Sequence, residues 1–332
     1  MTNKRVLITG ASGFIGSFLV EEALNRGFDT TAGIRKTSSK QYLQDERIRF
    51  LELDFADKAI LRKQLKDAGT FDYIIHNAGL TKTCDVHAFD QVNYQNTVNF
   101  IEALQENEQI PQKFIFISSL EAYGPGQPGT TIPVKDTDTP HPATRYGKSK
   151  LKAEKYIKNL SGFPWLIMRP TGVYGPRERD YFLVFKSIKQ GLETYIGKQT
   201  QHLSFIYVKD LTRLLFDMLA SEKVHKSYFG SDLNQYTSHQ FNKLIKKALQ
   251  KKTIKIYLPK ALVKFMAKIN EKIKCGLGKT PVLNSDKYYI ISQTNWLCDS
   301  SPLVSDFDFK PRYDLKRGVQ ESLDWYLANK WL

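Results

Sequence analysis

The sequence predicts an α/β protein in which a doubly wound parallel sheet carries a smaller mixed α/β lobe towards the C-terminus. Two observations support this class. Short apolar runs alternate with helical patterns through the first half of the chain, as in parallel strands joined by crossover helices. Beyond Pro170 the pattern breaks into shorter, mixed elements without an internal repeat, which is typical of an appended lobe.

The elements of the sheet follow in order along the N-terminal half. Strands are predicted in a run that ends near Ile34 and at residues 4–9, 73–76, 113–117 and 165–169. Helices are predicted where apolar residues recur at helical spacing, at residues 14–26, 87–107 and 144–160. In the second half, helices are predicted at residues 210–219, 238–250, 259–274 and 313–329. We expect one domain over residues 1–170, rejoined by residues 203–220, and a lobe over most of residues 171–332.

The composition is that of an ordinary globular protein. Of 332 residues, 41% are hydrophobic and 25% are charged, and no apolar run approaches the roughly 18 residues of a membrane span. The first ten residues lack the apolar core of a secretion signal, so we expect a cytoplasmic protein. The net charge of +15 is spread over surface-type segments without a nucleic-acid module, so we expect no nucleic-acid partner.

The three cysteines, Cys84, Cys275 and Cys298, are widely spaced along the chain. They are odd in number and form no C-x-x-C pattern. Such spacing suggests neither a disulfide framework nor a metal site, and we expect buried or inert thiols.

A glycine-rich turn reading Gly10-Ala-Ser-Gly-Phe-Ile-Gly16 follows the first predicted strand and opens the first predicted helix. In that context Gly10 permits the tight turn, Gly13 lets backbone N–H groups approach a pyrophosphate, and Gly16 lets the helix pack on the strand. The helix N-terminus also favours negative charge. We therefore predict a Rossmann-type NAD(P)-binding domain over residues 1–170, with cofactor contacts from Gly10, Ser12, Gly13, Phe14, Ile15 and Gly16.

The end of the second strand distinguishes between the two nicotinamide cofactors. An acidic residue there binds the adenosine ribose of NAD, whereas arginine accommodates the 2′-phosphate of NADP. The sequence Gly33-Ile34-Arg35-Lys36 has no acidic residue, so NADP(H) is favoured and NAD(H) stays an alternative. After the next strand, Asp54 and Phe55 are expected to contact the adenine, unless Asp54 caps the following helix.

Tyr146 and Lys150 begin a predicted helix four residues apart and therefore project from one face. A lysine ammonium beside a phenol stabilises tyrosinate and so prepares the phenol to act as a general acid. Ser119 follows the strand at residues 113–117, at the edge where open parallel sheets hold their ligands. We predict that these three residues form the catalytic set, with Ser119 as a hydrogen-bond donor to the substrate oxygen.

Segments spread over most of the chain resemble the extended short-chain dehydrogenase/reductase family, also called the NAD-dependent epimerase/dehydratase family. Besides Asp54, they are residues 9–16, 76–79, 118–124, 146–150, 169–176 and 204–210. The resemblance implies that Ala78 and Gly79 approach the cofactor's ribose and phosphate and that Thr171 and Val173 lie near the nicotinamide. It also implies a homodimer formed through the helices at residues 87–107 and 144–160.

Positions that distinguish the branches of this family favour a substrate without a nucleotide. Members that act on nucleotide sugars usually carry Asn at the position of Gly172 and Arg at that of Leu203, where they hold the diphosphate. Sugar dehydratases carry an Asp-Glu pair where this chain has Leu120-Glu121. The chain is instead similar to the hydroxysteroid dehydrogenase and dihydroflavonol reductase-like branch, and its candidates for a lipophilic pocket are Phe182, Phe185, Phe265 and Met266.

We therefore expect an NAD(P)-dependent oxidoreductase that transfers hydride between the cofactor and a ketone or secondary alcohol, with Tyr146 as general acid/base. A nucleotide-sugar 4-epimerase or 4-reductase is the alternative within the family, and a non-catalytic cofactor-sensing protein is the alternative of another class. We expect residues 171–332 to form mainly the substrate-binding lobe. Candidate small-molecule substrate contacts are Glu121, Arg177 and Arg179.

The helix expected near the start of the last quarter of the chain has apolar residues on one face and lysines around it, at residues 261–274. We expect this helix to be a lid over the substrate lobe. Peripheral contact with anionic lipid is the alternative that its pattern leaves open.

Overall fold

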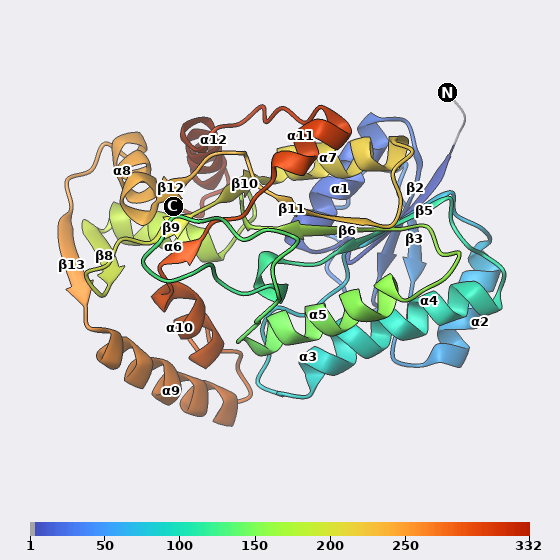
Figure 1. The fold of residues 1–332 in the computed structure, drawn as a ribbon, viewed down its shortest axis with the longest axis horizontal. Helices are drawn as coiled ribbons and strands as arrows, with labels where there is room; N and C mark the ends of the chain where they lie inside the picture. Colours follow the sequence, from blue (N-terminus) through green and yellow to red (C-terminus); the bar gives the residue numbers. More distant parts are fainter. Residues whose placement is uncertain (1–3) are drawn as a thin grey trace.

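A seven-stranded parallel sheet forms the larger part of the computed structural model, which describes residues 4–332 (Figure 1). Its strands lie in the order β11-β6-β5-β4-β1-β2-β3. They are β1 (Arg5–Thr9), β2 (Asp29–Ile34), β3 (Arg49–Glu52), β4 (Tyr73–His76), β5 (Lys113–Ile117), β6 (Trp165–Pro170) and β11 (Lys226–Gly230). From β1 the strands continue through β2 to β3 at one edge of the sheet. The chain then crosses back, so that β4 pairs with the other side of β1 and the later strands extend in the opposite direction. The predicted doubly wound α/β fold is confirmed.

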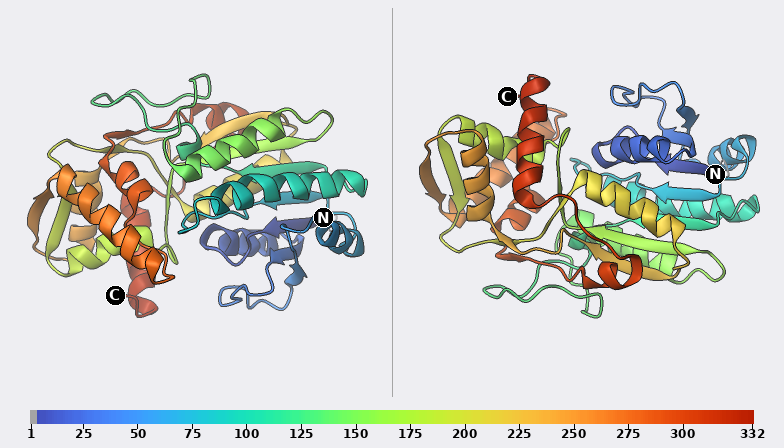
Figure 2. Two further views of the ribbon diagram at one scale, coloured as in Figure 1. Left: turned by 90° about the horizontal axis from the view of Figure 1, so that it is seen from below. Right: turned by 90° about the horizontal axis from the view of Figure 1, so that it is seen from above.

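Helices cover both faces of the sheet (Figures 1 and 2). One face carries α1 (Phe14–Asn25) and α7 (Val208–Ala220), and the other carries α2 (Lys58–Ala68), α4 (Asn96–Glu106) and α5 (Arg145–Lys158). Successive residues of β1 serve opposite faces: Ile8 packs in the core under α1 and α7, whereas Leu7 packs with α2, α4 and α5. Each face of the sheet is therefore buried under its own helical layer.

The sheet takes one more strand from the second half of the chain than the sequence predicts. The prediction has residues 203–220 rejoin the sheet domain, but the chain stays with the sheet through Gly230, where β11 pairs in parallel with β6. The helix α11 (Ser301–Phe307) then packs near β11. A strand of the sequence Lys-Ser-Tyr-Phe-Gly has no continuous apolar run, which explains why its pattern does not predict it.

The single helix predicted over residues 87–107 consists of three pieces. A short α3 (Ala88–Asp90) leads into a π-helical turn, η1 (Gln91–Gln95), and then into α4. Asn93, in the middle of the π-helical turn, is fully buried. Such turns are rare and frequently lie at functional sites.

The smaller lobe lies at one end of the sheet and has its own core (Figures 1 and 2). Its short strands pair as β7 (Gly172–Tyr174) with β10 (Phe205–Tyr207), β8 (Leu192–Ile196) with β13 (Ile254–Leu258), and β9 (His202–Leu203) with both β12 (Tyr236–Thr237) and β14 (Asn295–Trp296). Its helices are α6 (Asp180–Lys189), α8 (Ser238–Ala248), α9 (Lys260–Gly276), α10 (Ser285–Ser292) and α12 (Leu315–Ala328). Among residues 4–332 no helix has the length and apolar character needed to cross a membrane.

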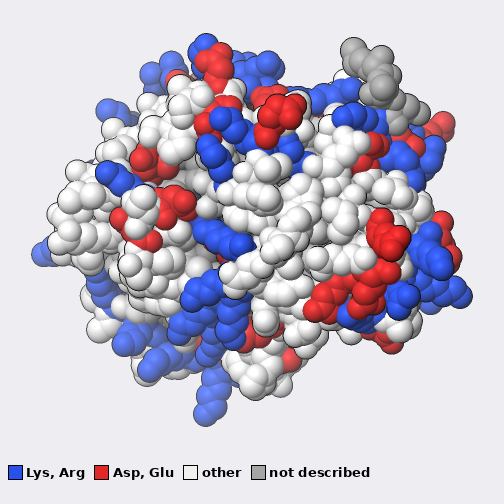
Figure 3. Space-filling view, turned by 45° about the vertical axis from the view of Figure 1, so that its right-hand side comes forward, with Lys and Arg blue, Asp and Glu red and all other residues white. Residues whose placement is uncertain are grey.

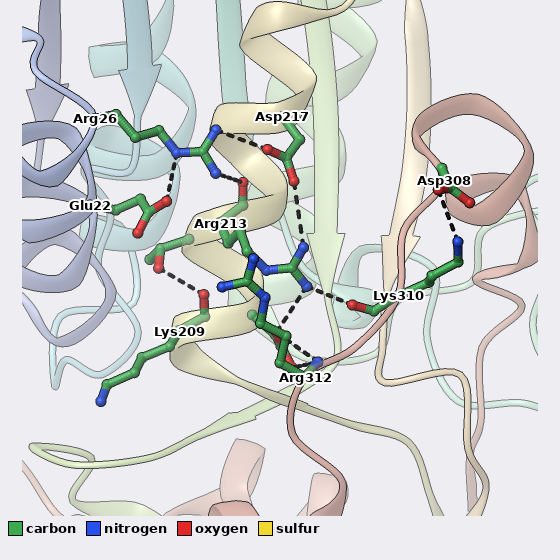
Figure 4. A network of polar contacts seen from close by, with 10 residues as sticks. Glu22, Arg26, Lys209, Arg213, Asp217, Asp308, Lys310 and Arg312 are labelled. Carbon is green, nitrogen blue, oxygen red and sulfur yellow. Dashed lines mark hydrogen bonds and ion pairs between the residues drawn. The ribbon is translucent and has the colours of Figure 1, made fainter.

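A polar network joins α1, α7 and the segment before α12 (Figure 4). Arg26 donates to Glu22 at 2.6 Å and to Asp217 at 2.8 Å. The buried carboxylate of Asp210 accepts hydrogen bonds from the backbone N–H groups of Arg312 and Tyr313, each at 2.9 Å. The network therefore fixes the chain that leads to α12 against the helical layer of the sheet.

The cysteines contradict the sequence prediction of inert thiols. Cys84, in the loop after β4, and Cys275, in the last turn of α9, form a disulfide with a Cα–Cα distance of 5.5 Å. They lie 191 residues apart in sequence, so spacing alone carries no sign of their proximity. Cys298 is the buried free thiol of the three. The disulfide ties α9 of the smaller lobe to the sheet domain.

Candidate active site

A cavity of about 790 Å³ lies at the carboxyl ends of the central strands, between the sheet and the smaller lobe. This is the edge where open α/β sheets bind their ligands. Most of the predicted site residues line it, namely Gly10, Ser12, Gly13, Phe14, Ile15, Arg35, Phe55, Ala78, Gly79, Ser119, Glu121, Tyr146, Lys150, Thr171, Val173, Arg177 and Arg179. The fold thus brings together groups from both lobes.

The glycine-rich turn crosses directly over the loop that follows β4. Gly10 has a φ of +64°, and a Cβ there would lie 2.8 Å from the backbone of Ala78. A Cβ on Gly16 would lie 2.1 Å from the carbonyl oxygen of Gly10, so only glycine lets α1 start this close to β1. Gly16 does not line the cavity, and its role is this close packing.

The N-terminus of α1 fits the pyrophosphate of a dinucleotide. Its N-cap is Gly13, and neither a capping side chain nor an acidic residue occupies its first turn. The N–H groups there are therefore left for a ligand, and the helix dipole favours an anion at this end. Ser12, Phe14 and Ile15 line the cavity beside it, so these residues would hold the cofactor's phosphates.

The adenosine end of the cavity differs in part from the sequence prediction. Arg35 and Ser38 line it just beyond β2, and the backbone N–H of Arg35 donates to the Ser38 hydroxyl at 3.1 Å. Phe55 lines it as well, whereas Asp54 does not. The carboxylate of Asp54 accepts from the N–H of Ala56 at 3.1 Å, and it is Asp57 that caps α2. The alternative that Asp54 caps the helix is therefore wrong, and its contact with the adenine stays a prediction.

The helix α5 positions Tyr146 and Lys150 on the wall of the cavity. Thr144 caps this helix by accepting from the N–H of Gly147 at 3.0 Å, which fixes Tyr146 in the first turn. The buried ammonium of Lys150 donates to the carbonyl oxygen of Ile117 at 2.8 Å. The Ser119 hydroxyl oxygen accepts from the N–H of Glu121 at 3.1 Å, so its proton remains available to a substrate oxygen.

Burial shifts the protonation of this group of residues. It lowers the pKa of Lys150 to about 7, a shift that the carboxylate of Glu154 opposes. The pKa of Tyr146 is raised by burial and by the nearby charge of Glu121, while the Ser119 hydroxyl lowers it. Burial also raises the pKa of Glu121 to about 7, against the hydrogen bond from Thr144. Lys150 and Glu121 therefore change charge near neutral pH, which suits proton transfer at a working site.

Sequence reasoning missed Asn93, which holds the wall of the cavity in place. Its amide oxygen accepts from the N–H of Leu80 at 2.7 Å, and its amide nitrogen donates to the Leu80 carbonyl and to the Ser149 hydroxyl, both at 2.9 Å. A Cβ at Gly79 would lie 3.1 Å from Asn93 and 3.3 Å from the ammonium of Lys150. Asn93 therefore links the loop after β4 to α5 beside the catalytic set.

A second missed group is the buried His76, which the sequence shows only as part of a family motif. Its ring nitrogens lie 2.9 Å from the Thr9 hydroxyl and 3.1 Å from the Thr97 hydroxyl. Burial and the charge of Lys150 lower its pKa to about 3, so the ring is neutral. The Thr9 hydroxyl also accepts from the N–H of Ala78 at 3.1 Å, and this network orders the loop over which the cofactor turn crosses.

Carboxylates line the substrate end of the cavity. Besides Glu121 they include Glu178, Asp180 and Asp286, with Lys287 donating to Asp180 at 2.9 Å. Lys82 forms a second ion pair with Asp180. This end of the cavity therefore holds four carboxylates together with the ammonium groups of Lys82 and Lys287.

The two arginines predicted as substrate contacts behave differently. Arg177 reaches the helix α1, where it donates to Ser17 at 2.9 Å and to Glu21 at 2.5 Å, so its guanidinium serves the packing of the lobes. Arg179 is exposed at the rim, with its guanidinium over the ring of Trp331. Of the two, only Arg179 keeps a free guanidinium edge at the mouth of the cavity.

The apolar pocket candidates do not line the cavity. Phe185 and Phe182 belong to the core of the smaller lobe, and Phe265 and Met266 are exposed on α9.

At the branch-specific positions, a Cβ on Gly172 would lie 2.3 Å from the Tyr181 hydroxyl, so the tyrosine fills the space of a larger side chain. Leu203 packs against the lobe's core.

The sequence model of the family described as "NAD dependent epimerase/dehydratase family" matches residues 6–234, well over half of the chain. The chain belongs to this family. The predicted resemblance is confirmed, and the chain is an enzyme of the extended short-chain dehydrogenase/reductase type. This membership opposes the non-catalytic alternative.

Known members of the family match nearly the whole length of this chain. The chain is 27% identical over 339 residues to UDP-glucose 4-epimerase of Vibrio cholerae, covering 98% of this chain and 96% of that one. It is 25% identical over 344 residues to ceramide reductase of Caulobacter vibrioides, again covering 98% and 96%. The fold matches the crystal structure of UDP-glucose 4-epimerase from Thermus thermophilus in complex with NAD, with a TM-score of 0.76 at 19% identity over 97% of this chain and 99% of that one.

Proposed function

We propose that this family member transfers hydride between a nicotinamide cofactor and the carbon of a ketone or secondary alcohol, with Tyr146 as general acid/base. The observation that supports this most directly is the convergence of Ser119, Tyr146 and Lys150 on one cavity with the uncapped N-terminus of α1. Tyr146 thus lines the same cavity as the residues that would hold the cofactor. The family's dependence on NAD agrees with it.

In the reducing direction, Tyr146 donates its phenolic proton to the substrate oxygen. The bound cofactor supplies the hydride. Lys150 stabilises the resulting tyrosinate because its ammonium is buried and has only one backbone acceptor, the carbonyl of Ile117. The Ser119 hydroxyl donates to the same substrate oxygen and polarises the carbonyl before the proton moves.

The cofactor preference proposed here is NADP(H). The support is the position of Arg35 beside the Ser38 hydroxyl at the end of β2, with no carboxylate among the cavity residues of that strand end. The family as a whole is NAD-dependent, and neighbours such as the Thermus thermophilus epimerase bind NAD. NAD(H) is therefore the competing assignment.

An Arg35→Asp variant tests this preference. We expect it to weaken NADPH binding by about tenfold or more, with little change for NADH, because a charge-assisted contact to the 2′-phosphate is lost. The exposed Lys63→Asp is the control with the same change of charge. Equal binding of NADPH and NADH by the unaltered protein would reject the preference.

The proposed substrate is a ketone without a nucleotide. The support is that Gly172 and Leu203 carry no side-chain group that could bind a diphosphate. Ceramide reductase, which this chain matches over nearly its whole length, is a relative whose name indicates a reduction and includes no nucleotide.

A second candidate is a nucleotide-sugar 4-epimerase. The names of the relatives favour it, since UDP-glucose 4-epimerase of Vibrio cholerae also matches over nearly the whole length and at slightly higher identity. Such an enzyme would oxidise and re-reduce its sugar with the same Tyr146.

One assay separates the two candidates. Purified protein and NADPH or NADH are mixed with long-chain ketones, ketosteroids, flavonoid-type ketones or UDP-sugars, and both reduced cofactor and products are measured. A reductase consumes one reduced cofactor for each alcohol formed, whereas an epimerase changes the sugar and leaves the cofactor level constant. Turnover of UDP-sugars alone, without net cofactor consumption, would overturn the ketone assignment.

A further inference from the structure

The helix α9 exposes a continuous apolar face to the surroundings. Phe265 is 62% exposed and Ile273 is 55% exposed, and Leu262, Met266 and Ile269 are each more than 40% exposed. At about 100° of rotation per residue, these five side chains fall within one third of the helix circumference. Large apolar side chains gathered in this way on a protein surface mark an interaction site.

The helix is held to the protein by a different face. Val263 and Ala267 are buried beneath it, and Asn270 donates to the carbonyl of Leu283 at 2.7 Å. Glu271 accepts from the Ser285 hydroxyl at 2.6 Å. Because these anchors already fix α9, its apolar face is left without a partner in the part of the chain that the structure describes.

The surroundings of this face are strongly basic. Residues 251–279 contain nine lysines and a single acidic residue, Glu271, giving a net charge of +8. No ion pair involves any of these lysines among the described residues, and Glu271 is engaged by Ser285 and Arg145. Lys264, Lys268 and Lys272 form a stripe along one border of the apolar face. Figure 3 shows basic side chains gathered along the lower edge of the molecule, the edge where α9 runs in Figure 1.

Exposed apolar side chains also flank the helix along the chain. On the strand that precedes it, Ile254 is 71% exposed and Tyr257 is 44% exposed. After the helix, Leu277 is 65% exposed and Val282 is 54% exposed, and Val282 also lines the cavity of the candidate active site. Exposed apolar side chains therefore occur from β13 through α9 to Val282, which lies at the candidate site.

We propose that α9 and its flanks dock on the surface of an anionic lipid bilayer. Apolar side chains on one face enter the boundary between headgroups and acyl chains, while a border of lysines contacts the lipid phosphates. A second copy of the chain fits poorly, since it would place two surfaces of charge +8 against each other. This proposal concerns where the enzyme works and does not depend on the reaction proposed above.

Sedimentation with lipid vesicles tests the proposal without any substrate. We expect the protein to bind vesicles of phosphatidylglycerol and phosphatidylcholine at least roughly tenfold more tightly than vesicles of phosphatidylcholine alone. The triple variant Lys264→Glu, Lys268→Glu, Lys272→Glu should lose at least roughly tenfold of that binding. The matched control reverses the same number of exposed lysines elsewhere, Lys63→Glu, Lys316→Glu and Lys330→Glu, and should bind within about twofold of the unaltered protein.

A second variant tests the apolar half of the surface. Phe265→Ser with Ile273→Ser should also weaken vesicle binding, and because both side chains are exposed the melting temperature should be unchanged. Failure to prefer anionic vesicles, or equal loss of binding in the α9 charge variant and the control charge variant, would overturn the proposal. It would be overturned as well if sedimentation equilibrium showed a dimer that this double variant dissociates, since the surface would then belong to a second copy.

Discussion

At the wall of the cavity, two opposing effects act on the pKa of Tyr146. Burial and the charge of Glu121 raise the pKa of the phenol, and a buried ammonium is needed to offset them when the proton leaves. Glu121 is therefore the charged residue that most affects the pKa of Tyr146. Its own pKa of about 7 makes that influence depend on pH.

Replacing Tyr146 by Phe removes the proton donor while preserving the shape of the side chain. We expect kcat to fall by at least about 100-fold, with cofactor affinity within about twofold, because the phenol acts on the substrate oxygen. Stopped-flow turnover and fluorescence titration measure the two quantities. The control is Tyr156→Phe on the same helix, whose side chain packs against the core under α5 and should leave kcat unchanged. A Tyr146→Phe variant with normal kcat would remove Tyr146 from the mechanism.

Glu121→Gln should alter how stability depends on pH. The pKa of Glu121 is raised from 4.5 to about 7, so the folded state holds a proton that the unfolded state releases between those values. The free energy of unfolding of the unaltered protein should therefore fall as pH rises through this window, by up to roughly 3 kcal/mol. The Gln variant lacks this loss. Urea unfolding at about pH 4.5 and about pH 8 measures it, and equal pH dependence of the two proteins would contradict the burial of this carboxyl.

At the scale of elements, the π-helical turn η1 holds the segments around the site in place. It presents Asn93 to Leu80 on one side and Ser149 on the other, so a turn in one helix fixes both a loop and the neighbouring helix. Three hydrogen bonds made by one buried amide leave little freedom to the segment that carries Gly79. The Lys150 ammonium lies close to this segment, 3.3 Å from where a Cβ on Gly79 would be.

An Asn93→Asp substitution tests this support. It keeps the acceptor for the Leu80 N–H but loses the donors to the Leu80 carbonyl and the Ser149 hydroxyl. We expect a loss of about 1–3 kcal/mol of stability together with a shifted pH profile of kcat, since a new charge lies near Lys150. Asn99→Asp, further along on α4, changes the same chemistry and should lower stability while leaving the pH profile unchanged.

The sequence predicts the sheet elements to within a few residues because the strands and helices of its N-terminal half have strong apolar periodicity. The exceptions have physical reasons. The strand β11 is short and half polar, and η1 has the same apolar spacing as the helices that flank it. The glycine-rich turn and the set Ser119, Tyr146 and Lys150 could be named in advance because strand ends and helix starts determine where such residues gather.

The remaining site residues required the tertiary structure. Asn93 looks like any polar residue of a surface helix until its burial is known. The cap of α2 is Asp57 and not Asp54, although both acidic residues follow the same strand. The aromatic and aliphatic side chains of α9 match a pocket lining in pattern but face outwards.

At the scale of the whole molecule, the two lobes are joined by covalent and non-covalent links around the cavity. The Cys84–Cys275 disulfide ties α9 to the loop after β4, while Arg177 of the smaller lobe reaches Glu21 on α1. The predicted pairing of two chains through α3–α4 and α5 stays a prediction. In a reducing compartment the two cysteines would be free thiols, so the state of the link depends on where the protein is found.

Reduction of this disulfide should lower stability. It closes a loop of 191 residues, for which chain entropy gives roughly 5 kcal/mol as an upper value. Differential scanning calorimetry with and without dithiothreitol should show a fall of several degrees in melting temperature for the unaltered protein. A Cys84→Ser variant should melt at the lower temperature under both conditions. If the melting temperature of the unaltered protein is the same with and without dithiothreitol, the two cysteines do not form a disulfide.

The π-helical turn contains one residue more than an α-helix would need to span the same segment. Its hydrogen bonds skip five residues instead of four, so residues 91–95 hold one residue that an α-helix does not need. Deleting one residue there would let an uninterrupted α-helix form, and a regular helix is easier to build. The same deletion would rotate everything before it by about 100° against everything after it and turn Asn93 away from Leu80 and Ser149. In terms of insertion and deletion, this turn is an extra residue that costs helical regularity and places Asn93 against Leu80 and Ser149.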